Sequence, residues 1–200
     1  MEGSNDDPLR LIRKMQTSYS AFLEANESME APIVDSSKHN WEPPPHGIVK
    51  VNFDGVVCSS GRGVGIGVVA RHHLGTCVDW IATSVSTVHN PEQAEALAAR
   101  SVAEMIQRNS WHRILLEGDC LTMINRLRAP VRDDSYVSPI LVDTTNILQS
   151  THSWEVRHIR RSGNRVAHLL AQEAKLQSNC NLILSEDVRA AIQVDSNSYE

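Results

Sequence analysis

Apolar and polar residues alternate strictly over VKVNFD, residues 49–54. This period of two is typical of a strand with one buried face. Asp54 ends the alternation and Gly55 follows it, so we expect the strand to deliver the Asp54 carboxylate to a rim of the sheet. Glycines then lead into a second apolar run, which predicts a strand over 64–71 that returns antiparallel. A hairpin in which Asp54 is only a turn residue is the structural alternative.

The remaining pattern alternates strands with amphipathic helices. A third strand is predicted over 76–84. Asn90, Pro91 and Gln93 then provide a cap, a first-turn proline and a capping box for a helix that runs to about Arg108. Later segments predict strands over 111–117 and 154–159. They also predict three helices: one directly after Asp119, one from Ser135 or Ser138 to Leu148, and one over 162–175. The resulting order is β-β-β-α-β-α-α-β-α.

The two ends of the chain differ from this middle part. A helix is predicted over 8–25, followed by a segment rich in Ser, Asn, Glu and Pro that ends in Pro43-Pro44-Pro45. Three consecutive prolines fit neither a helix interior nor a central strand. We therefore expect an N-terminal helix and flexible linker over 1–40 and a folded domain over 41–177. A C-terminal tail is expected over 178–200, with a short helix around 185–194.

Length, charge and cysteine content narrow the class of protein. A chain of 200 residues suits one domain with flanking segments, and no apolar run is long enough to span a membrane. The net charge of −5 argues against a protein that coats nucleic acid broadly, but it allows a local basic surface. The 4 cysteines form no C-x-x-C pair, which favours reduced thiols over a zinc site or disulfides. The acidic start MEGSNDDP lacks secretory and transit-peptide features, so we expect an intracellular monomer, nuclear or cytoplasmic.

Three acidic residues fall at positions where a carboxylate could serve chemistry. Asp54 ends the first strand, Glu95 lies in a helix beside the small residues Ala94 and Ala98, and Asp119 follows the fourth strand. Two of them have clear structural alternatives. Glu95 could be a solvated helix edge, and Asp119 could cap the helix that follows it.

Five segments in this order resemble the type 1 ribonuclease H family, in particular the ribonuclease H-like domain of plant retroelement reverse transcriptases and its stand-alone plant relatives. They span roughly residues 41–174 and are WEPPPHGIVKVNFDG, GVGIGVVAR, AEALAA around Glu95, LLEGDCL around Asp119 and VRHIRRSGNRVAHLLA. The resemblance implies an α/β, ribonuclease H-like fold. This fold has a mixed five-stranded sheet of order 3-2-1-4-5, flanked by helices on both faces.

The resemblance also implies a carboxylate site for two Mg²⁺ or Mn²⁺ ions. In-line hydrolysis of a phosphodiester needs an activated water on one side and a stabilised leaving oxygen on the other, and two cations about 4 Å apart do both. Hard divalent cations take oxygen ligands. Asp54 would bridge both ions, and Glu95 and Asp119 would complete the first metal site.

The last segment departs from the family's pattern at one position. The family's N-x-x-A-D motif ends in a fourth metal-site Asp, whereas this chain reads NRVAH from Asn164 to His168. An imidazole can ligate Mn²⁺ but is a poor ligand for Mg²⁺, and it removes one negative charge. His168 is therefore either a candidate catalytic residue in a weakened second metal site or a helix residue without a ligand role.

Basic and hydroxyl residues near these segments are candidates for nucleic-acid contacts. Ser59 and Ser60 follow Asp54 in the chain and could contact a 2′-hydroxyl. A group of arginines gathers where the last strand meets the last helix. Their structural alternative is exposed charge that only keeps the protein in solution. We expect these arginines to contact phosphates; they are Arg157, Arg160, Arg161 and Arg165.

Three functions from different classes are consistent with this pattern. The first is a metal-dependent endonuclease that cuts the RNA strand of RNA–DNA hybrids. The second is a ribonuclease H-like module that binds hybrid or double-stranded RNA with little or no turnover. The third is a protein-interaction scaffold that works through the N-terminal helix. The presence of all three acids favours the enzyme, and His168 in place of Asp is the feature that separates the first two.

Overall fold

The computed structural model describes residues 41–58, 63–88, 90–129, 133–176 and 184–197. These residues belong to one compact unit, which spans His39–Glu200. The N-terminal helix and linker predicted over 1–40 lie outside the described residues and stay predictions.

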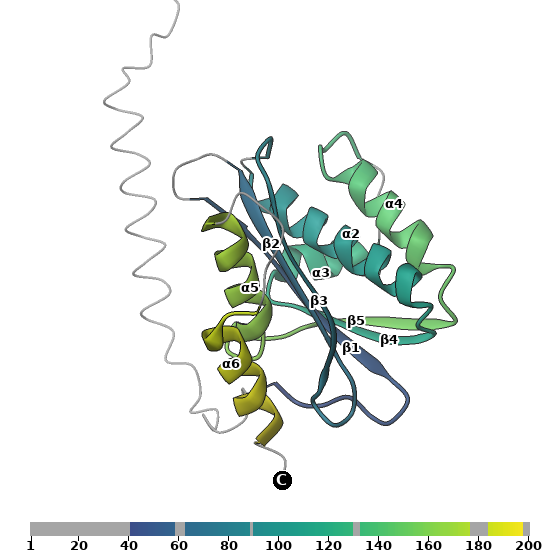
Figure 1. Cartoon of the computed structure of the whole chain (residues 1–200). Coiled ribbons are helices and arrows are strands. Elements are labelled where there is room, and N and C mark those ends of the chain that lie inside the picture. The colour runs from purple at the N-terminus through teal and green to yellow at the C-terminus, as the bar shows by residue number, and fades with distance from the viewer. Residues whose placement is uncertain (1–40, 59–62, 89, 130–132, 177–183, 198–200) are drawn as a thin grey trace, which may run out of the picture. The chain divides into compact units, whose positions relative to one another are not determined.

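A mixed five-stranded sheet forms the centre of the domain (Figure 1). Its order is β3-β2-β1-β4-β5, as predicted. β2 pairs antiparallel with β1 and β3, whereas β4 pairs parallel with β1 and β5. Because β1 and β4 run parallel, their carboxyl ends lie at the same edge of the sheet. The strands are β1 (Val49–Val57), β2 (Val64–Arg71), β3 (Cys77–Val85), β4 (Arg113–Gly118) and β5 (Ser153–His158).

Helices cover both faces of the sheet, which confirms the predicted layers (Figure 1). On the first face α2 packs against β1, β2 and α4, and α3 contacts β5; on the second face α5 packs against β1, β2 and β3, and α6 against α5. Val68 and Val69, neighbours in β2, belong to different hydrophobic clusters, so both faces of the central strands are buried. None of the helices described combines the length and the apolar character that a membrane crossing requires. They are α2 (Pro91–Asn109), α3 (Leu121–Arg128), α4 (Ser138–Leu148), α5 (Arg165–Leu176) and α6 (Glu186–Asn197).

Two glycines of β2 bring α5 into backbone contact with the sheet. A Cβ on Gly65 would lie 2.0 Å from the carbonyl oxygen of Ala171, and one on Gly67 would lie 2.1 Å from that of Ala167. These glycines therefore serve a close approach of helix and strand. The alanines on α5 contribute to it, because longer side chains there would push the helix away.

The C-terminal segment adds a helix to the second face. The sequence pattern predicts a tail with a short helix over 185–194, and the structure has α6 there. Val188 and Ala191 of α6 are buried in a cluster with Val166 and Leu170 of α5. This apolar contact makes α6 part of the folded domain.

The contact between α5 and β2 yields a stability prediction. In Gly67→Ala the new methyl group would lie 2.1 Å from a backbone oxygen and 2.4 Å from a backbone nitrogen of α5. Backbone atoms move only if the helix moves, so we expect a loss of about 3 kcal/mol, at the upper end of overpacking costs. Urea unfolding measures it. Ser84→Ala, at an exposed position of the neighbouring β3, should change stability by less than about 0.5 kcal/mol. Equal stability of the two variants would show that α5 does not press on the strand.

Candidate active site

β1 extends beyond the residues that pair with its parallel neighbour β4, and Asp54 lies in this extension. Pairing with β4 stops at Asn52 and Glu117, whereas pairing with β2 continues to Val57. Asp54 therefore lies inside β1, opposite Gly67, and not at the strand end predicted from the sequence. The turn-residue alternative is also wrong, because Asp54 is a strand residue and only 3% exposed.

α2 delivers Glu95 to the same edge of the sheet. Asn90 caps this helix as predicted, because its side chain accepts hydrogen bonds from two backbone N–H groups of the first turn. Gly55 lets the helix start approach β1, since a Cβ there would lie 2.3 Å from the carbonyl carbon of Ala94. Glu95 follows Ala94 directly, so this contact holds it beside the strand residue that precedes Gly55.

Asp119 follows β4 and does not cap the next helix. The N-cap of α3 is Cys120, which makes no side-chain capping hydrogen bond. Oδ1 of Asp119 instead accepts a hydrogen bond of 2.8 Å from Nδ2 of Asn164, and the same Nδ2 donates to the backbone oxygen of Phe53 at 2.9 Å. The capping alternative is therefore wrong. Asn164 ties Asp119 to the residue that precedes Asp54.

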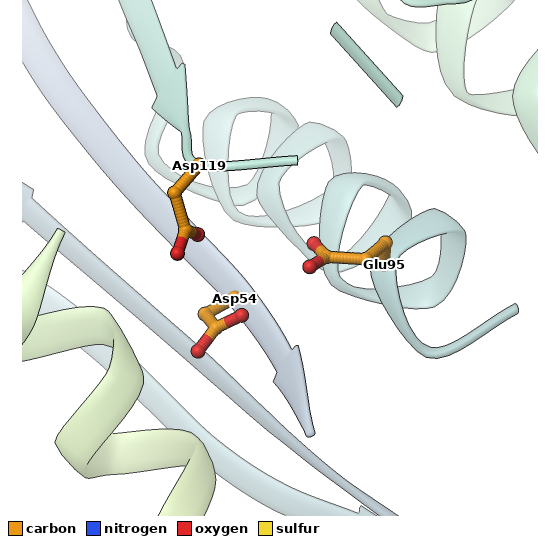
Figure 2. A group of neighbouring side chains, drawn as sticks. All are labelled: Asp54, Glu95 and Asp119. Atoms are coloured by element: carbon orange, nitrogen blue, oxygen red, sulfur yellow. The ribbon is translucent and has the colours of Figure 1, made fainter. Parts of the chain in front are cut away.

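The three acids converge on one point (Figure 2). Asp54, Glu95 and Asp119 each offer a carboxylate oxygen, and these oxygens lie within 4.8 Å of one another. Figure 2 shows the three carboxylates pointing toward one another from a strand, a helix and the end of a second strand. This is the convergence that the sequence predicts. Within the described part of the chain, His168 is not a member of this group.

Burial and the repulsion between neighbouring carboxylates raise the pKa of two of these acids, Glu95 and Asp54. Burial, followed by the negative charges of Asp54 and Asp119, raises the pKa of Glu95 to about 9. Burial also raises the pKa of Asp54, and the hydrogen bond with His168 opposes that rise. Oε2 of Glu95 is buried without a hydrogen-bond partner. A divalent cation would contact this oxygen and relieve the repulsion, so the all-oxygen group fits Mg²⁺ or Mn²⁺.

His168 lies next to Asp54. Its Nδ1 is 2.5 Å from Oδ2 of Asp54, and Nη2 of Arg161 is 2.8 Å from its Nε2. A guanidinium only donates hydrogen bonds and an ionised carboxylate only accepts them, so the arrangement places the ring proton on Nδ1. In this arrangement His168 holds Asp54 through a hydrogen bond. A role for His168 in catalysis or metal binding stays a prediction.

Two of the four predicted phosphate-binding arginines have acidic neighbours of their own. Arg157 forms a forked ion pair with Glu155 of the same strand, at 2.6 and 2.9 Å. Arg165 lies near Asp195 of α6, where its positive charge counteracts the burial that raises the pKa of that carboxyl group. Arg157 is thus paired within its own strand, and the charge of Arg165 acts on a carboxyl group of α6.

The other two arginines border the carboxylates. Nη1 of Arg161 lies 3.8 Å from Oδ2 of Asp119, and the Arg161 side chain is 65% exposed. Arg160 is exposed in the turn before α5. Ser59 and Ser60 lie outside the described residues. The nucleic-acid contacts of all these residues stay predictions.

Two further residues of this region are not among the predicted site residues. Asn164 holds Asp119, and its place four residues before His168 puts both on one side of a helical turn, which is a signal that the sequence does carry. His158 has its Nε2 3.1 Å from the backbone oxygen of Asp119. No local signal marks His158, because it is the pairing of β5 with Gly118 of β4 that brings it there.

Comparisons with known proteins agree with this fold. Residues 52–174 match the family model described as reverse transcriptase-like. The chain belongs to this family. The matched residues include all three acids and His168, whereas α6 lies beyond them. No curated protein matches the sequence. The plant retroelement origin implied by the resemblance stays a prediction.

Several solved structures share the fold of this reverse transcriptase-like chain. RNase H1 from Halobacterium salinarum has 22% identity and a TM-score of 0.58, with 64% of this chain and 96% of that one covered. The N-terminal RNase H domain of rv2228c from Mycobacterium tuberculosis has 14% identity and a TM-score of 0.58, with coverages of 74% and 97%. LC11-RNase H1, solved with an RNA/DNA hybrid, has 16% identity and a TM-score of 0.50, with coverages of 63% and 95%. At these identities the similarity shows the ribonuclease H fold alone.

The raised pKa of Glu95 predicts how the metal-free protein responds to pH. Folding raises this pKa from 4.5 to about 9, so between these values the folded state binds more protons than the unfolded chain. The free energy of unfolding therefore falls as pH rises through this window. The Glu95→Gln variant has no ionisable group at this position. With a chelator present at about pH 8, it should therefore melt a few degrees above the wild type. Its free energy of unfolding should also depend much less on pH across this window. Thermal unfolding across pH measures both.

Glu104→Gln is the matched control for this measurement. Glu104 lies on the same helix and its side chain is 52% exposed, so its removal should leave the pH slope unchanged. Added Mg²⁺ should stabilise the wild type more than Glu95→Gln, because the cation favours the ionised carboxylate. A wild-type stability that is flat over this window in chelator contradicts the raised pKa.

Proposed function

We propose that the chain is a divalent-metal-dependent endonuclease that hydrolyses the RNA strand of RNA–DNA hybrids. The convergence of Asp54, Glu95 and Asp119, with oxygens within 4.8 Å of one another, carries this proposal. The family match supports it. The similar LC11-RNase H1, solved with an RNA/DNA hybrid, supports the substrate class.

Asp54, Glu95 and Asp119 would hold Mg²⁺ or Mn²⁺. When bound, the ions supply an activated water and stabilise the charge of the leaving oxygen. Asn164 fixes the carboxylate of Asp119 against the backbone of β1, and His168 fixes that of Asp54. These contacts hold the acids in place before the substrate arrives, which lowers the reorganisation needed during the reaction.

The exposed arginines at the rim would orient the substrate. Arg161 stands beside Asp119 and is open to solvent, so its guanidinium can meet a phosphate next to the one being cut. Arg160 directly precedes Arg161 and is also exposed. Arginine suits this role because its planar fork binds phosphate through paired hydrogen bonds. Contacts of this kind position the strand without reading its sequence.

One observation favours a second candidate function, a module that binds hybrid or double-stranded RNA and turns over slowly or not at all. His168 donates a hydrogen bond to Asp54 where the family's pattern has a fourth carboxylate. With fewer negative charges, a second cation is held less tightly. Binding of the nucleic acid does not require that second ion.

A cleavage assay distinguishes the two functions. Purified chain with labelled RNA–DNA hybrid should cut the RNA strand in Mg²⁺ or Mn²⁺ and leave double-stranded DNA intact. Asp119→Asn should lower the rate by at least about 100-fold, because loss of outer partners of a metal site already costs about 10–100-fold and Asp119 would be a direct ligand. Gel analysis of the products gives the rates.

The control variant for this assay is Asp143→Asn. Asp143 is an acid of α4 whose side chain is 48% exposed and pairs with Arg100, so its removal should leave cleavage unchanged. Absence of cleavage in either metal, with Asp119→Asn binding the hybrid as tightly as the wild type, would establish the binding module instead. If the chain neither cleaves nor binds the hybrid, both functions are rejected.

His168 yields a separate prediction about metal preference. Wild-type cleavage should be weaker in Mg²⁺ than in Mn²⁺, because the site lacks one oxygen ligand and one negative charge. His168→Asp supplies both beside Asp54, so it should raise the Mg²⁺-supported rate by about tenfold or more. Initial rates in each metal measure the ratio.

Gln172→Glu is the matched control for His168→Asp. Its amide lies 2.8 Å from Nε2 of His168, one helical turn further along α5, so it adds a charge without replacing the imidazole. It should leave the ratio of Mg²⁺ to Mn²⁺ rates close to that of the wild type. Equal Mg²⁺ rates for the wild type and His168→Asp would identify the histidine as a bystander.

A further inference from the structure

A buried polar network lies on the second face of the sheet, next to the carboxylates. Its residues on β1 alternate with Val51 and Phe53, which belong to the first-face core. Buried charges cost free energy unless they are paired, and the reaction proposed above uses none of these groups. Except for Asp195, which is partly buried, its members are at most 5% exposed; they are Trp41, Lys50, Asn52, Arg71, Glu117 and Asp195.

Glu117 of β4 is the point where this network crosses between strands. Its Oε1 lies 2.7 Å from Nζ of Lys50, and its Oε2 accepts a hydrogen bond of 3.2 Å from Nδ2 of Asn52. Both partners belong to β1. One carboxylate therefore clamps β4 to β1 through side chains, in addition to the backbone pairing of these strands.

The orientation of Asn52 is fixed from its other side. Its Oδ1 accepts hydrogen bonds from Nε1 of Trp41 at 2.9 Å and from Nη2 of Arg71 at 3.0 Å. Arg71 is held in turn by the Asp195 carboxylate at 2.6 Å and by stacking on Trp41. Because two donors occupy Oδ1, the amide must present Nδ2 to Glu117 and cannot flip.

The clamp lies at the last paired residues before the two strands part. Backbone pairing of β1 and β4 ends at Asn52 and Glu117. Asp54 and Asp119 each follow two residues later, beyond the paired residues of the two strands. Like charges at short range repel, so the strand ends that carry them tend to separate. A rigid bridge directly before this point opposes that separation.

Stability alone does not explain a buried ion pair here. Replacing such a pair by apolar residues of similar volume is often neutral or even stabilising. What the pair provides and apolar packing does not is a fixed geometry between two particular strands.

We propose that Glu117, held by Lys50 and Asn52, is a positioning residue that sets the spacing of Asp54 and Asp119 and thereby the affinity of the site for a divalent cation. The part about the cation rests on the proposed function. The part about the spacing does not, and a structure of the metal-free protein can test it alone.

Two variants test the clamp in different ways. Glu117→Gln keeps the shape but offers one acceptor oxygen to two donors, so either Lys50 or Asn52 must face an NH₂ group. The double variant Lys50→Met with Glu117→Met removes both charges and keeps the volume filled. Arg108→Gln, at an exposed ion pair with Asp79, is the matched control for loss of an ion pair elsewhere.

The first readout is the Mg²⁺ affinity of the metal-free 200-residue chain, measured by calorimetry without nucleic acid. We expect both clamp variants to bind Mg²⁺ about 10–100-fold more weakly, as is typical when partners of metal ligands are lost. The double variant should fold but melt several degrees below the wild type, because Nδ2 of Asn52 and the carbonyl oxygen of Glu42 lose their partners on Glu117 and Lys50. Arg108→Gln should keep wild-type affinity. Unchanged affinity in a folded double variant overturns the proposal. Failure of both clamp variants to fold also overturns it, since the network would then serve the fold alone.

The second readout separates this inference from the proposed function. If the wild type binds neither Mg²⁺ nor Mn²⁺, the proposed function fails. Crystal structures of the metal-free wild type and clamp variants then decide the positioning role. Carboxylate oxygens of Asp54 and Asp119 that move apart beyond the 4.8 Å of the wild-type arrangement support it, and an unchanged spacing overturns it.

Discussion

The repulsion among three closely spaced carboxylates is the constraint on which the arrangement of this domain depends. Asp54, Glu95 and Asp119 would separate if their backbones were free, because like charges repel more strongly as the surroundings become less polar. The parallel pairing of β1 with β4 and the contact of α2 with β1 prevent this. The domain thus holds the acids together at a cost in stability, which is characteristic of functional sites.

Glycine residues, which have no side chain, are as important to this arrangement as the acids. Gly55 allows the start of α2 to contact the strand that carries Asp54, and Gly65 and Gly67 allow α5 to contact β2 from the other face. Two helices therefore lie close enough to the sheet to direct Glu95 and His168 toward one edge. Larger residues at these glycines would move whole helices, since the nearest atoms belong to backbone.

Segments on both sides of the matched family region complete the second face. Trp41 precedes residues 52–174 and Asp195 follows them, yet both contact Arg71 of β2, which is fully buried. The matched region alone does not contain these partners of the guanidinium. The network that they form continues through Asn52 to Glu117, so the flanking segments are linked to the strands that carry Asp54 and Asp119.

The sequence by itself determined the strands, the start of α2 and the places of the three acids in the chain, because alternation, capping residues and turn glycines act over a few residues. The tertiary structure alone decided that Asp119 bonds Asn164 and does not cap α3, that Arg157 pairs with Glu155, and that α6 packs on the domain. Strand register and helix approach settle these contacts between distant residues. Local periodicity reports which face a residue occupies, but not which residue of another element it meets there.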